Sequence, residues 1–259
     1  MLETDWPSPM TRAELIRWAR DNAHLHDNRE QTLISEPGHW DSGPDRSHTN
    51  RYHLAKNQIE ALRAKKMLDA AMGCGYGALI MQPEVYVGVD IQDHVMEYAT
   101  KFVLPWVKGH CEIIKNDLSK KLPFENSTFD FVTSFETIEH IGDEEELTAM
   151  REKRKAKHKS NVREEFMHEI WRILMPGGTW MVSSPLTGAR QELVSIYHCH
   201  EYELSELHAD LLRSNYKIRR VYQQTTQEPE LIFVNPIVKP RERSDRDKIY
   251  YVVFQCEKP

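Results

Sequence analysis

The chain has 259 residues, of which 40% are apolar and 29% are charged, and its formal net charge is −6. This balance is typical of a globular protein and argues against one that coats nucleic acid over its whole surface, although a local basic patch is compatible with it. No apolar stretch approaches the roughly 20 residues that a membrane helix needs, and the N-terminus lacks the basic start and apolar run of a secretory signal. We therefore expect a soluble, cytoplasmic protein without membrane contact, and the four widely separated cysteines predict free thiols.

Residues 1–48 predict an N-terminal helical cover. Apolar residues recur at helical spacing over residues 11–22, and residues 36–44 are rich in turn-forming Pro and Gly. A second helical pattern follows at residues 50–65. We expect the remaining chain, residues 49–259, to form one α/β domain behind this cover.

After residue 65 the chain alternates short apolar runs with helix-like segments. Such runs predict strands that are buried on both faces of a parallel sheet, and the alternation predicts stacked βαβ units, which is a doubly wound α/β fold. The predicted strands are residues 67–71, 85–90, 111–114, 129–134, 179–184, 216–224 and 249–255. A helix is predicted near residues 203–214, and residues 227–248 predict a long, mostly exposed connection.

A glycine-rich turn follows the first predicted strand and leads into a helix. Glycine lets a ligand approach the backbone closely, and a helix start offers N–H groups to it. Asp90, 21 residues after Asp69, ends the second predicted strand, where a carboxylate can accept hydrogen bonds from both ribose hydroxyls. The spacing of Gly73, Gly75 and Ala78 also fits a dinucleotide fingerprint, so the turn by itself admits NAD.

Later segments separate these alternatives. The runs MLDAAMGCGYG at 67–77, DIQ at 90–92, NDL at 116–118, LPFENSTFD at 122–130 and MPGG at 175–178 together resemble the successive motifs of the class I S-adenosylmethionine-dependent methyltransferases. The resemblance covers nearly all of residues 66–186. It implies a mostly parallel seven-stranded sheet in the order 3-2-1-4-5-7-6 with strand 7 antiparallel, and it implies S-adenosylmethionine as the cofactor.

The same resemblance implies which residues contact the cofactor: Asp69, Ala71, Met72, Gly73, Gly75, Asp90, Ile91, Asp117, Leu118 and Phe135. Asp90 also has a purely structural interpretation, because it can cap the helix that follows it. Tyr52 and His53, ahead of the first strand, either cover the cofactor or pack within their own helix.

The reaction centre is expected behind the fourth strand. Methyl transfer is an in-line displacement, so the enzyme must hold a nucleophile against the methyl carbon and, for a hydroxyl acceptor, remove its proton. Such groups lie at the carboxyl ends of the strands, where this sequence has Glu136, Glu139 and His140. If this segment is helical, the three side chains share a face. Without a metal, His140 or His198 would act as the general base.

The string Glu-x-x-Glu-His resembles the metal-binding segment of the ubiquinone-pathway O-methyltransferases and of the small-RNA 3′-terminal 2′-O-methyltransferases. In the second group a downstream histidine completes the site, and His200 matches its spacing slightly better than His198. The resemblance implies Glu136, Glu139, His140 and His200 as ligands of Mg²⁺, Mn²⁺ or Zn²⁺. The alternative is that this turn only packs and positions the cofactor.

Residues 143–163 predict a charged insertion at the rim of the substrate cleft. An acidic run at 143–146 precedes seven Lys or Arg residues within 151–163. These basic residues either contact phosphates or belong to a solvated helix that pairs with its own acidic start. The segment lacks the interleaved aromatic residues on which single-stranded RNA would stack.

Three functions remain after these observations. The sequence favours O-methylation of a small hydroxylated metabolite, such as a sugar or a phenolic compound. The second is a metal-dependent 2′-O-methyltransferase acting on RNA. The third, from another class, is a regulatory protein that binds S-adenosylmethionine without turnover.

Overall fold

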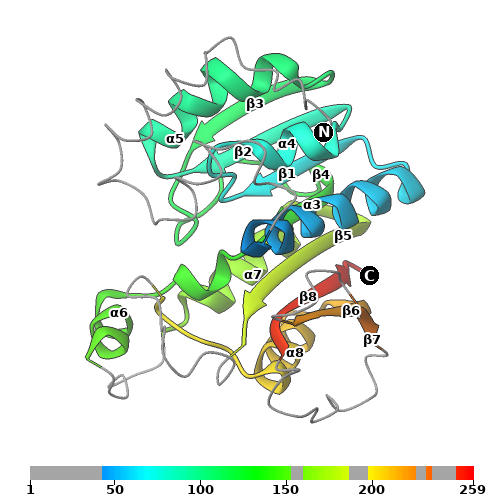
Figure 1. Cartoon of the computed structure of the whole chain (residues 1–259). Helices are drawn as coiled ribbons and strands as arrows, with labels where there is room; N and C mark the ends of the chain where they lie inside the picture. The colour runs from blue at the N-terminus through cyan, green and yellow to red at the C-terminus, as the bar shows by residue number, and fades with distance from the viewer. Residues whose placement is uncertain (1–42, 153–159, 187–197, 226–231, 235–248) are drawn as a thin grey trace.

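The computed structural model describes residues 43–152, 160–186, 198–225, 232–234 and 249–259 (Figure 1). The predicted helix at residues 11–22 lies outside this part of the chain, as do the centre of the charged insertion and most of the connection at 227–248. None of the helices within the described ranges is long and apolar enough to cross a membrane.

One mixed sheet organises the molecule, and within the described residues its strand order is β3-β2-β1-β4-β5-β8-β6-β7. Strands β1 to β5 pair in parallel, and β8 lies antiparallel between β5 and β6. The predicted order 3-2-1-4-5-7-6 with an antiparallel last strand is confirmed, with β8 in the seventh place. The strands are β1 (Lys66–Ala70), β2 (Val85–Asp90), β3 (His110–Lys115), β4 (Phe129–Ser134), β5 (Leu174–Pro185), β6 (Lys217–Thr225), β7 (Ile232–Val234) and β8 (Ile249–Glu257).

Strand β7 corrects the prediction that residues 227–248 form only a connection. It pairs antiparallel with β6 at the edge of the sheet. A strand of three residues is too short to show an alternating pattern, and the Pro- and Arg-rich sequence around it indicates a loop.

The helices cover both faces of the sheet. They are α3 (Gly43–Leu62), α4 (Tyr76–Met81), α5 (Asp93–Tyr98), α6 (Glu144–Arg151), α7 (Val162–Ile173) and α8 (Leu204–Arg213). Helix α3 lies across the middle of the sheet, whereas α6 stands away from it (Figure 1). Helix α3 begins seven residues before the predicted start at residue 50, so it crosses the predicted boundary between cover and domain at residue 48.

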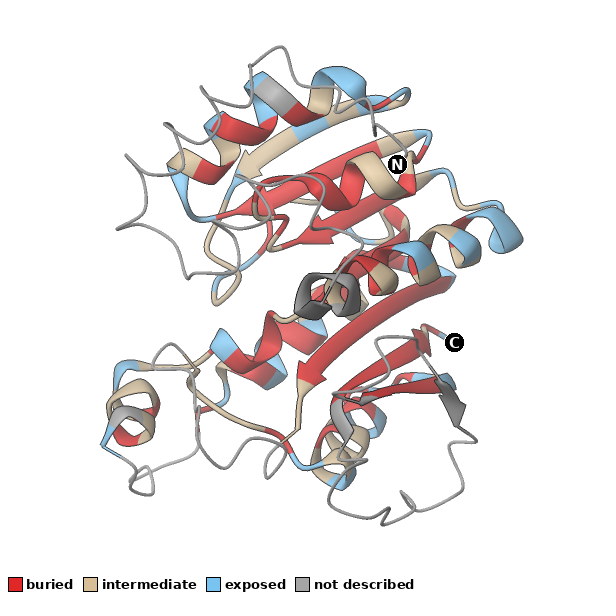
Figure 2. Cartoon of the chain, viewed as in Figure 1, coloured by how far each residue is buried: buried red, intermediate tan, exposed pale blue. Residues whose placement is uncertain are grey.

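Two apolar cores follow from the alternation of side chains along the strands. Residues such as Leu68, Val132 and Trp180 share one core with α7 and α8. Their neighbours Met67, Phe131 and Met181 face the other core, which contains Tyr52, Ala55 and Ile59 of α3. Burial is accordingly concentrated in the central strands and in the inner faces of these helices (Figure 2).

The MPGG run shapes the start of β5. Phe129 of β4 pairs with Leu174, but Phe131 pairs with Thr179, so the intervening residues leave the regular register. Gly177 has a φ of 77°, a left-handed conformation that glycine adopts at little cost. The run is thus the turn into the regular part of β5.

Candidate active site

The glycine turn follows β1 at the carboxyl edge of the sheet. Ala71, Gly73 and Gly75 have positive φ angles of 64°, 53° and 78°, so the chain reverses tightly here. The amide of Met72 donates to the carbonyl of Val89 at 3.0 Å, which ties the turn to β2. The turn that the sequence predicts for the cofactor is therefore built on two adjacent parallel strands.

Asp90 joins the end of β2 to this turn. Its Oδ2 accepts a hydrogen bond from the amide of Gly73 at 3.0 Å, and its Oδ1 accepts from the amides of Ile91 and Gln92 at 2.8 and 3.0 Å. These bonds show that Asp90 caps the backbone. A carboxylate has about four acceptor positions, so its predicted contact with the ribose is compatible with this geometry and stays a prediction.

The NDL run forms a turn beside Asp90. The amide of Asn116 donates to the main-chain oxygen of Asp90 at 3.0 Å. Asp117 Oδ1 accepts from the amide of Ser119 at 2.8 Å, which closes a local turn. Leu118 packs against the core on the α7 side. The structure thus brings the predicted adenine turn next to the predicted ribose carboxylate.

Asp69 is enclosed by the sheet. Its side chain is fully buried, and its two oxygens accept hydrogen bonds from the Tyr86 hydroxyl at 3.0 Å and the Thr133 hydroxyl at 2.8 Å. Burial raises the pKa of Asp69 to about 7, against the opposing effect of these two bonds. Asp69 therefore links β1, β2 and β4 directly beneath the glycine turn.

Helix α3 covers the glycine turn on one face of the sheet, and its residue Tyr52 packs there. The Tyr52 ring is buried and lies 5.0 Å from the ring of Phe135 and 5.2 Å from that of Tyr76. A Cβ atom at Gly77 would come within 2.3 Å of the Tyr52 ring, so only glycine permits this approach. Tyr52 thus packs against the turn, and His53 on the same helix is exposed.

The segment after β4 is not a regular helix, which corrects the assumption that placed Glu136 on one face with Glu139 and His140. Glu136 has a φ of 52°, and the following 3-10 turn comprises only Ile138–His140. The Glu136 carboxylate points to Ser183, whose hydroxyl donates to Oε1 at 2.9 Å. The Glu136 amide in turn donates to the Ser183 oxygen at 2.9 Å.

Arg51 of α3 is the second partner of Glu136. Its Nη1 lies 3.0 Å from Glu136 Oε1, and the Arg51 side chain is 1% exposed. Its Nε donates to Gln224 Oε1 at 2.8 Å, and its guanidinium lies 4.2 Å from the centre of the Tyr251 ring. Arg51 was not among the predicted site residues, because nothing in a helical pattern marks an arginine as buried.

Glu139, His140 and His198 form what we call the Glu139 cluster. Their candidate ligand atoms all lie within 4.8 Å of one another. Glu139 is fully buried, and no described residue forms a hydrogen bond with either of its carboxylate oxygens, although His140 Nε2 lies 4.0 Å from Oε1. Burial, followed by the nearby charge of Glu136, raises the pKa of Glu139 well above its ordinary value. A buried carboxyl group that forms no hydrogen bond with the described residues points to a bound group that would satisfy it.

Backbone hydrogen bonds hold the segment that contains His198 beside Glu139. The amides of Cys199 and His200 donate to the carbonyl oxygen of Glu139 at 2.7 and 3.1 Å. The absence of a side chain at Gly142 permits the close approach, because a Cβ there would lie 2.4 Å from the Cys199 Cβ. The rings of His140 and His198 consequently meet edge to face at 4.8 Å.

The four predicted metal ligands therefore do not all lie together in one site. Glu139 and His140 lie together, Glu136 pairs with Arg51, and His200 Nε2 hydrogen-bonds Glu206 Oε2 at 3.0 Å. His198, predicted as a general base, takes the place beside Glu139 that the prediction gave to His200.

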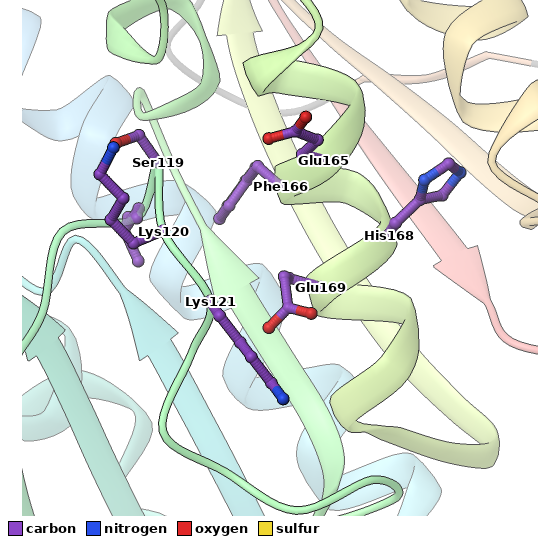
Figure 3. Close-up of a pocket in the computed structure, with 8 residues that line it drawn as sticks. Ser119, Lys120, Lys121, Glu165, Phe166, His168 and Glu169 are labelled. Carbon is purple, nitrogen blue, oxygen red and sulfur yellow. The ribbon is translucent and has the colours of Figure 1, made fainter.

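A surface pocket also lies between the loop after β3 and helix α7 (Figure 3). It is lined by Leu118, Ser119, Lys120, Lys121, Glu165, Phe166, His168 and Glu169. Among the predicted cofactor residues only Leu118 borders it, and the Glu139 cluster does not. This pocket therefore adjoins the predicted adenine turn and lies apart from the Glu139 cluster.

Comparison with known sequences supports the predicted class. Residues 68–182 match the family model described as a methyltransferase domain. A protein of Mycolicibacterium smegmatis, named a probable S-adenosylmethionine-dependent methyltransferase, is 24% identical over 149 residues, which are 55% of this chain and 48% of that protein. The matched region thus spans about half the length of this relative.

Comparison with solved structures supports the fold. The YcgJ protein of Bacillus subtilis superposes with a TM-score of 0.56 at 15% identity, over 82% of this chain and 99% of that one. The methyltransferase domain of the bacterial protein CtHen1-CN superposes with a TM-score of 0.53 at 19% identity, over 80% of this chain and 98% of that one. Residues 68–182 therefore resemble a methyltransferase domain in sequence, and the likeness to these two solved structures, which are under 25% identical, shows that the chain shares their fold.

Proposed function

We propose that this chain transfers the methyl group of S-adenosylmethionine to a hydroxyl oxygen of a small hydroxylated metabolite, such as a sugar or a phenolic compound, and that it does so in the cytoplasm. The observation that carries the proposal is the Glu139 cluster, which lies after β4 at the edge of the sheet that also carries the glycine turn. Strands β1 and β4 are neighbours, and the Thr137 hydroxyl donates to the Ala70 carbonyl at 3.4 Å. The cluster and the glycine turn therefore share one edge of the sheet.

The chemistry of a hydroxyl acceptor fits these groups. The hydroxyl oxygen attacks the methyl carbon, the carbon–sulfur bond breaks, and its electron pair stays on sulfur, which becomes the neutral thioether. The hydroxyl proton must leave in the same process. Without a bound metal, the imidazole of His140 or His198 is suited to take it, because a neutral imidazole has one ring nitrogen that can accept a proton. An amine acceptor that is already neutral needs no such base.

The cluster also fits a divalent metal ion. Glu139 supplies two oxygens that form no hydrogen bond with the described residues, and His140 and His198 supply imidazole nitrogens. One carboxylate and two imidazoles favour Zn²⁺ or Mn²⁺ over Mg²⁺, which prefers oxygen ligands throughout. A metal bound here would lower the pKa of the acceptor hydroxyl and orient it for attack.

A second candidate is methylation of a ribose 2′-hydroxyl in RNA. It is favoured by the Glu-x-x-Glu-His string, which resembles that of the small-RNA 2′-O-methyltransferases, and by the presence of a downstream histidine in the cluster. Against it, one of the seven basic residues of the charged insertion, Arg163, is 2% exposed and paired with Glu146. That side chain is not available to a phosphate.

The experiment that separates these functions uses S-adenosylmethionine labelled in its methyl group. The full chain is incubated with a small-metabolite extract and with total RNA, each with and without a chelator, and the labelled products are separated. We expect label in the small-metabolite pool. Label in RNA instead would support the second candidate, and cofactor binding without product in any pool would support a non-catalytic protein.

Variants make this test specific for the cluster. We expect Glu139→Gln to lower the rate about 100-fold or more while cofactor affinity is retained, because loss of the ligating carboxylate removes the metal's help in deprotonating the acceptor hydroxyl. His200→Gln is the matched control, because His200 bonds to Glu206 instead of the cluster. Equal rates for the wild type and Glu139→Gln would contradict a role of the cluster in catalysis.

A further inference from the structure

His198 pairs with Glu201 through one of its two ring nitrogens. The Nδ1 atom of His198 lies 3.2 Å from Glu201 Oε1, and both side chains are mostly buried, with 13% and 17% exposed. A carboxylate can only accept a hydrogen bond, so the proton between these atoms belongs to Nδ1. In a neutral imidazole the lone pair is then on Nε2. Glu201 thereby selects one of the two tautomers of His198.

The backbone fixes the direction in which this ring is presented. Cys199 and His200, which lie between His198 and Glu201, each donate a backbone hydrogen bond to the carbonyl oxygen of Glu139. Glu201 also lies close enough to Glu139 for its charge to raise the pKa of that carboxyl group. The one contact of the Glu201 side chain with the cluster that the structure gives among the described residues is its hydrogen bond with the ring of His198.

His200 provides a natural contrast two residues along the chain. It also pairs with a carboxylate, but through Nε2, which lies 3.0 Å from Glu206 Oε2 of α8. The two histidines therefore use opposite ring nitrogens for their carboxylate partners. Only His198 combines such a partner with a place beside Glu139 and His140.

We propose that Glu201 is a positioning residue of the Glu139 cluster, which holds His198 with its proton on Nδ1 and offers Nε2 as the donor atom to a divalent metal. The proposal rests on the metal site of the proposed function. Partners of this kind fix the tautomer and orientation of a ligating histidine and raise its basicity, and their removal weakens metal binding about 10- to 100-fold.

The first test examines the tautomer in the protein without added metal. Long-range proton–nitrogen NMR spectra of the full chain distinguish Nδ1–H from Nε2–H imidazole, and a His198→Gln variant assigns the signal. We expect the Nδ1–H form in the wild type and a mixture of tautomers in Glu201→Ala. Glu206→Ala is the matched control and should leave the His198 signal unchanged. An Nε2–H tautomer in the wild type would overturn the proposal.

The second test measures binding of Co²⁺ alone, through its visible absorption, which also reports the ligands. We expect Glu201→Ala to bind Co²⁺ about 10- to 100-fold more weakly than the wild type. Glu201→Gln, whose amide oxygen still accepts from Nδ1, should recover most of this affinity, and Glu206→Ala should match the wild type. Equal affinity and an equal spectrum for the wild type and Glu201→Ala would overturn the proposal.

The two tests distinguish failure of this inference from failure of the proposed function. If neither the wild type nor any variant binds Co²⁺ but the tautomer of His198 depends on Glu201 as expected, the metal site is contradicted and the positioning role of Glu201 is supported. If the wild type binds Co²⁺ and Glu201→Ala binds it equally well, the metal site is supported and the role of Glu201 is contradicted.

Discussion

The carboxyl group of Asp69 is a buried acid in the middle of the sheet, and its burial makes the stability of the fold depend on pH. In the folded protein its pKa is about 7, against an ordinary value of 3.8. Between these two values the folded protein keeps a proton that the unfolded chain has released. The contribution of Asp69 to stability therefore falls as the pH rises from about 4 to about 7 and is constant above that range.

We predict that Asp69→Asn removes this part of the pH dependence. The shift corresponds to about 4 kcal/mol of unfolding free energy between pH 4 and pH 8, and the amide retains hydrogen-bonding capacity toward Tyr86 and Thr133. Urea unfolding of the wild type and the variant at several pH values measures the difference. Asp93→Asn is the control, because Asp93 is 76% exposed. Parallel pH profiles for the wild type and Asp69→Asn would contradict the prediction.

Single residues also show where sequence reasoning reaches its limit at the site. Glu139 and His140 were predicted because they follow a strand end directly. The spacing favoured His200 slightly over His198 as the further ligand, whereas the structure brings His198 beside Glu139, through hydrogen bonds from the amides of Cys199 and His200 that no spacing reveals. Arg51 was missed because its partner Glu136 lies 85 residues away in the chain.

At the scale of elements, helix α6 is attached to the domain by a buried ion pair. Arg163 Nη2 lies 2.6 Å from Glu146 Oε1, and the Glu146 and Arg163 side chains are 5% and 3% exposed. Arg163 Nη1 also donates to the carbonyl of Ile141, at the end of the turn that contains His140, at 2.9 Å. The charged insertion therefore has a buried anchor, which its composition did not indicate.

We predict that Arg163→Met lowers the unfolding free energy by about 3–5 kcal/mol, because it leaves the Glu146 carboxylate buried without its partner. The variant should lose structure first around α6, so amide hydrogen exchange should increase in α6 more than in β4. The double variant Glu146→Leu, Arg163→Met should regain most of the stability, since it removes both charges. If the single and double variants unfold alike, the ion pair is not the anchor.

The strands show how well the sequence predicts whole elements. Predicted strands at 85–90 and 129–134 match β2 and β4, because central parallel strands are apolar on both faces and stand out from the helices. Helix α3 was predicted to start too late, since residues 43–49 carry no apolar stripe. Edge strand β7 was not predicted either, because an edge strand is defined by its partner more than by its own sequence.

At the scale of the whole molecule, Arg51 connects parts of the chain that are far apart in sequence. It joins helix α3 to the turn after β4 through Glu136, to β6 through Gln224 and to β8 through Tyr251. Helix α3 precedes the matched family region, yet it shares a core with β1, β4 and β5. We therefore expect α3 to unfold together with the sheet in one cooperative step.

We predict that Arg51→Met lowers the unfolding free energy by about 3–5 kcal/mol, because Glu136, which is 13% exposed, loses its cation. A methionine still packs against Tyr251, so the fall in unfolding free energy measures the loss of the Arg51 charge and of its hydrogen bond to Gln224. Urea unfolding followed by both tryptophan fluorescence and circular dichroism measures it. Lys115→Met is the control, because Lys115 pairs with Asp93 at the surface, where an ion pair contributes about 1 kcal/mol at most. The two probes should give one coincident transition in every variant, and an early separate loss of helix signal would show that α3 is an independent unit.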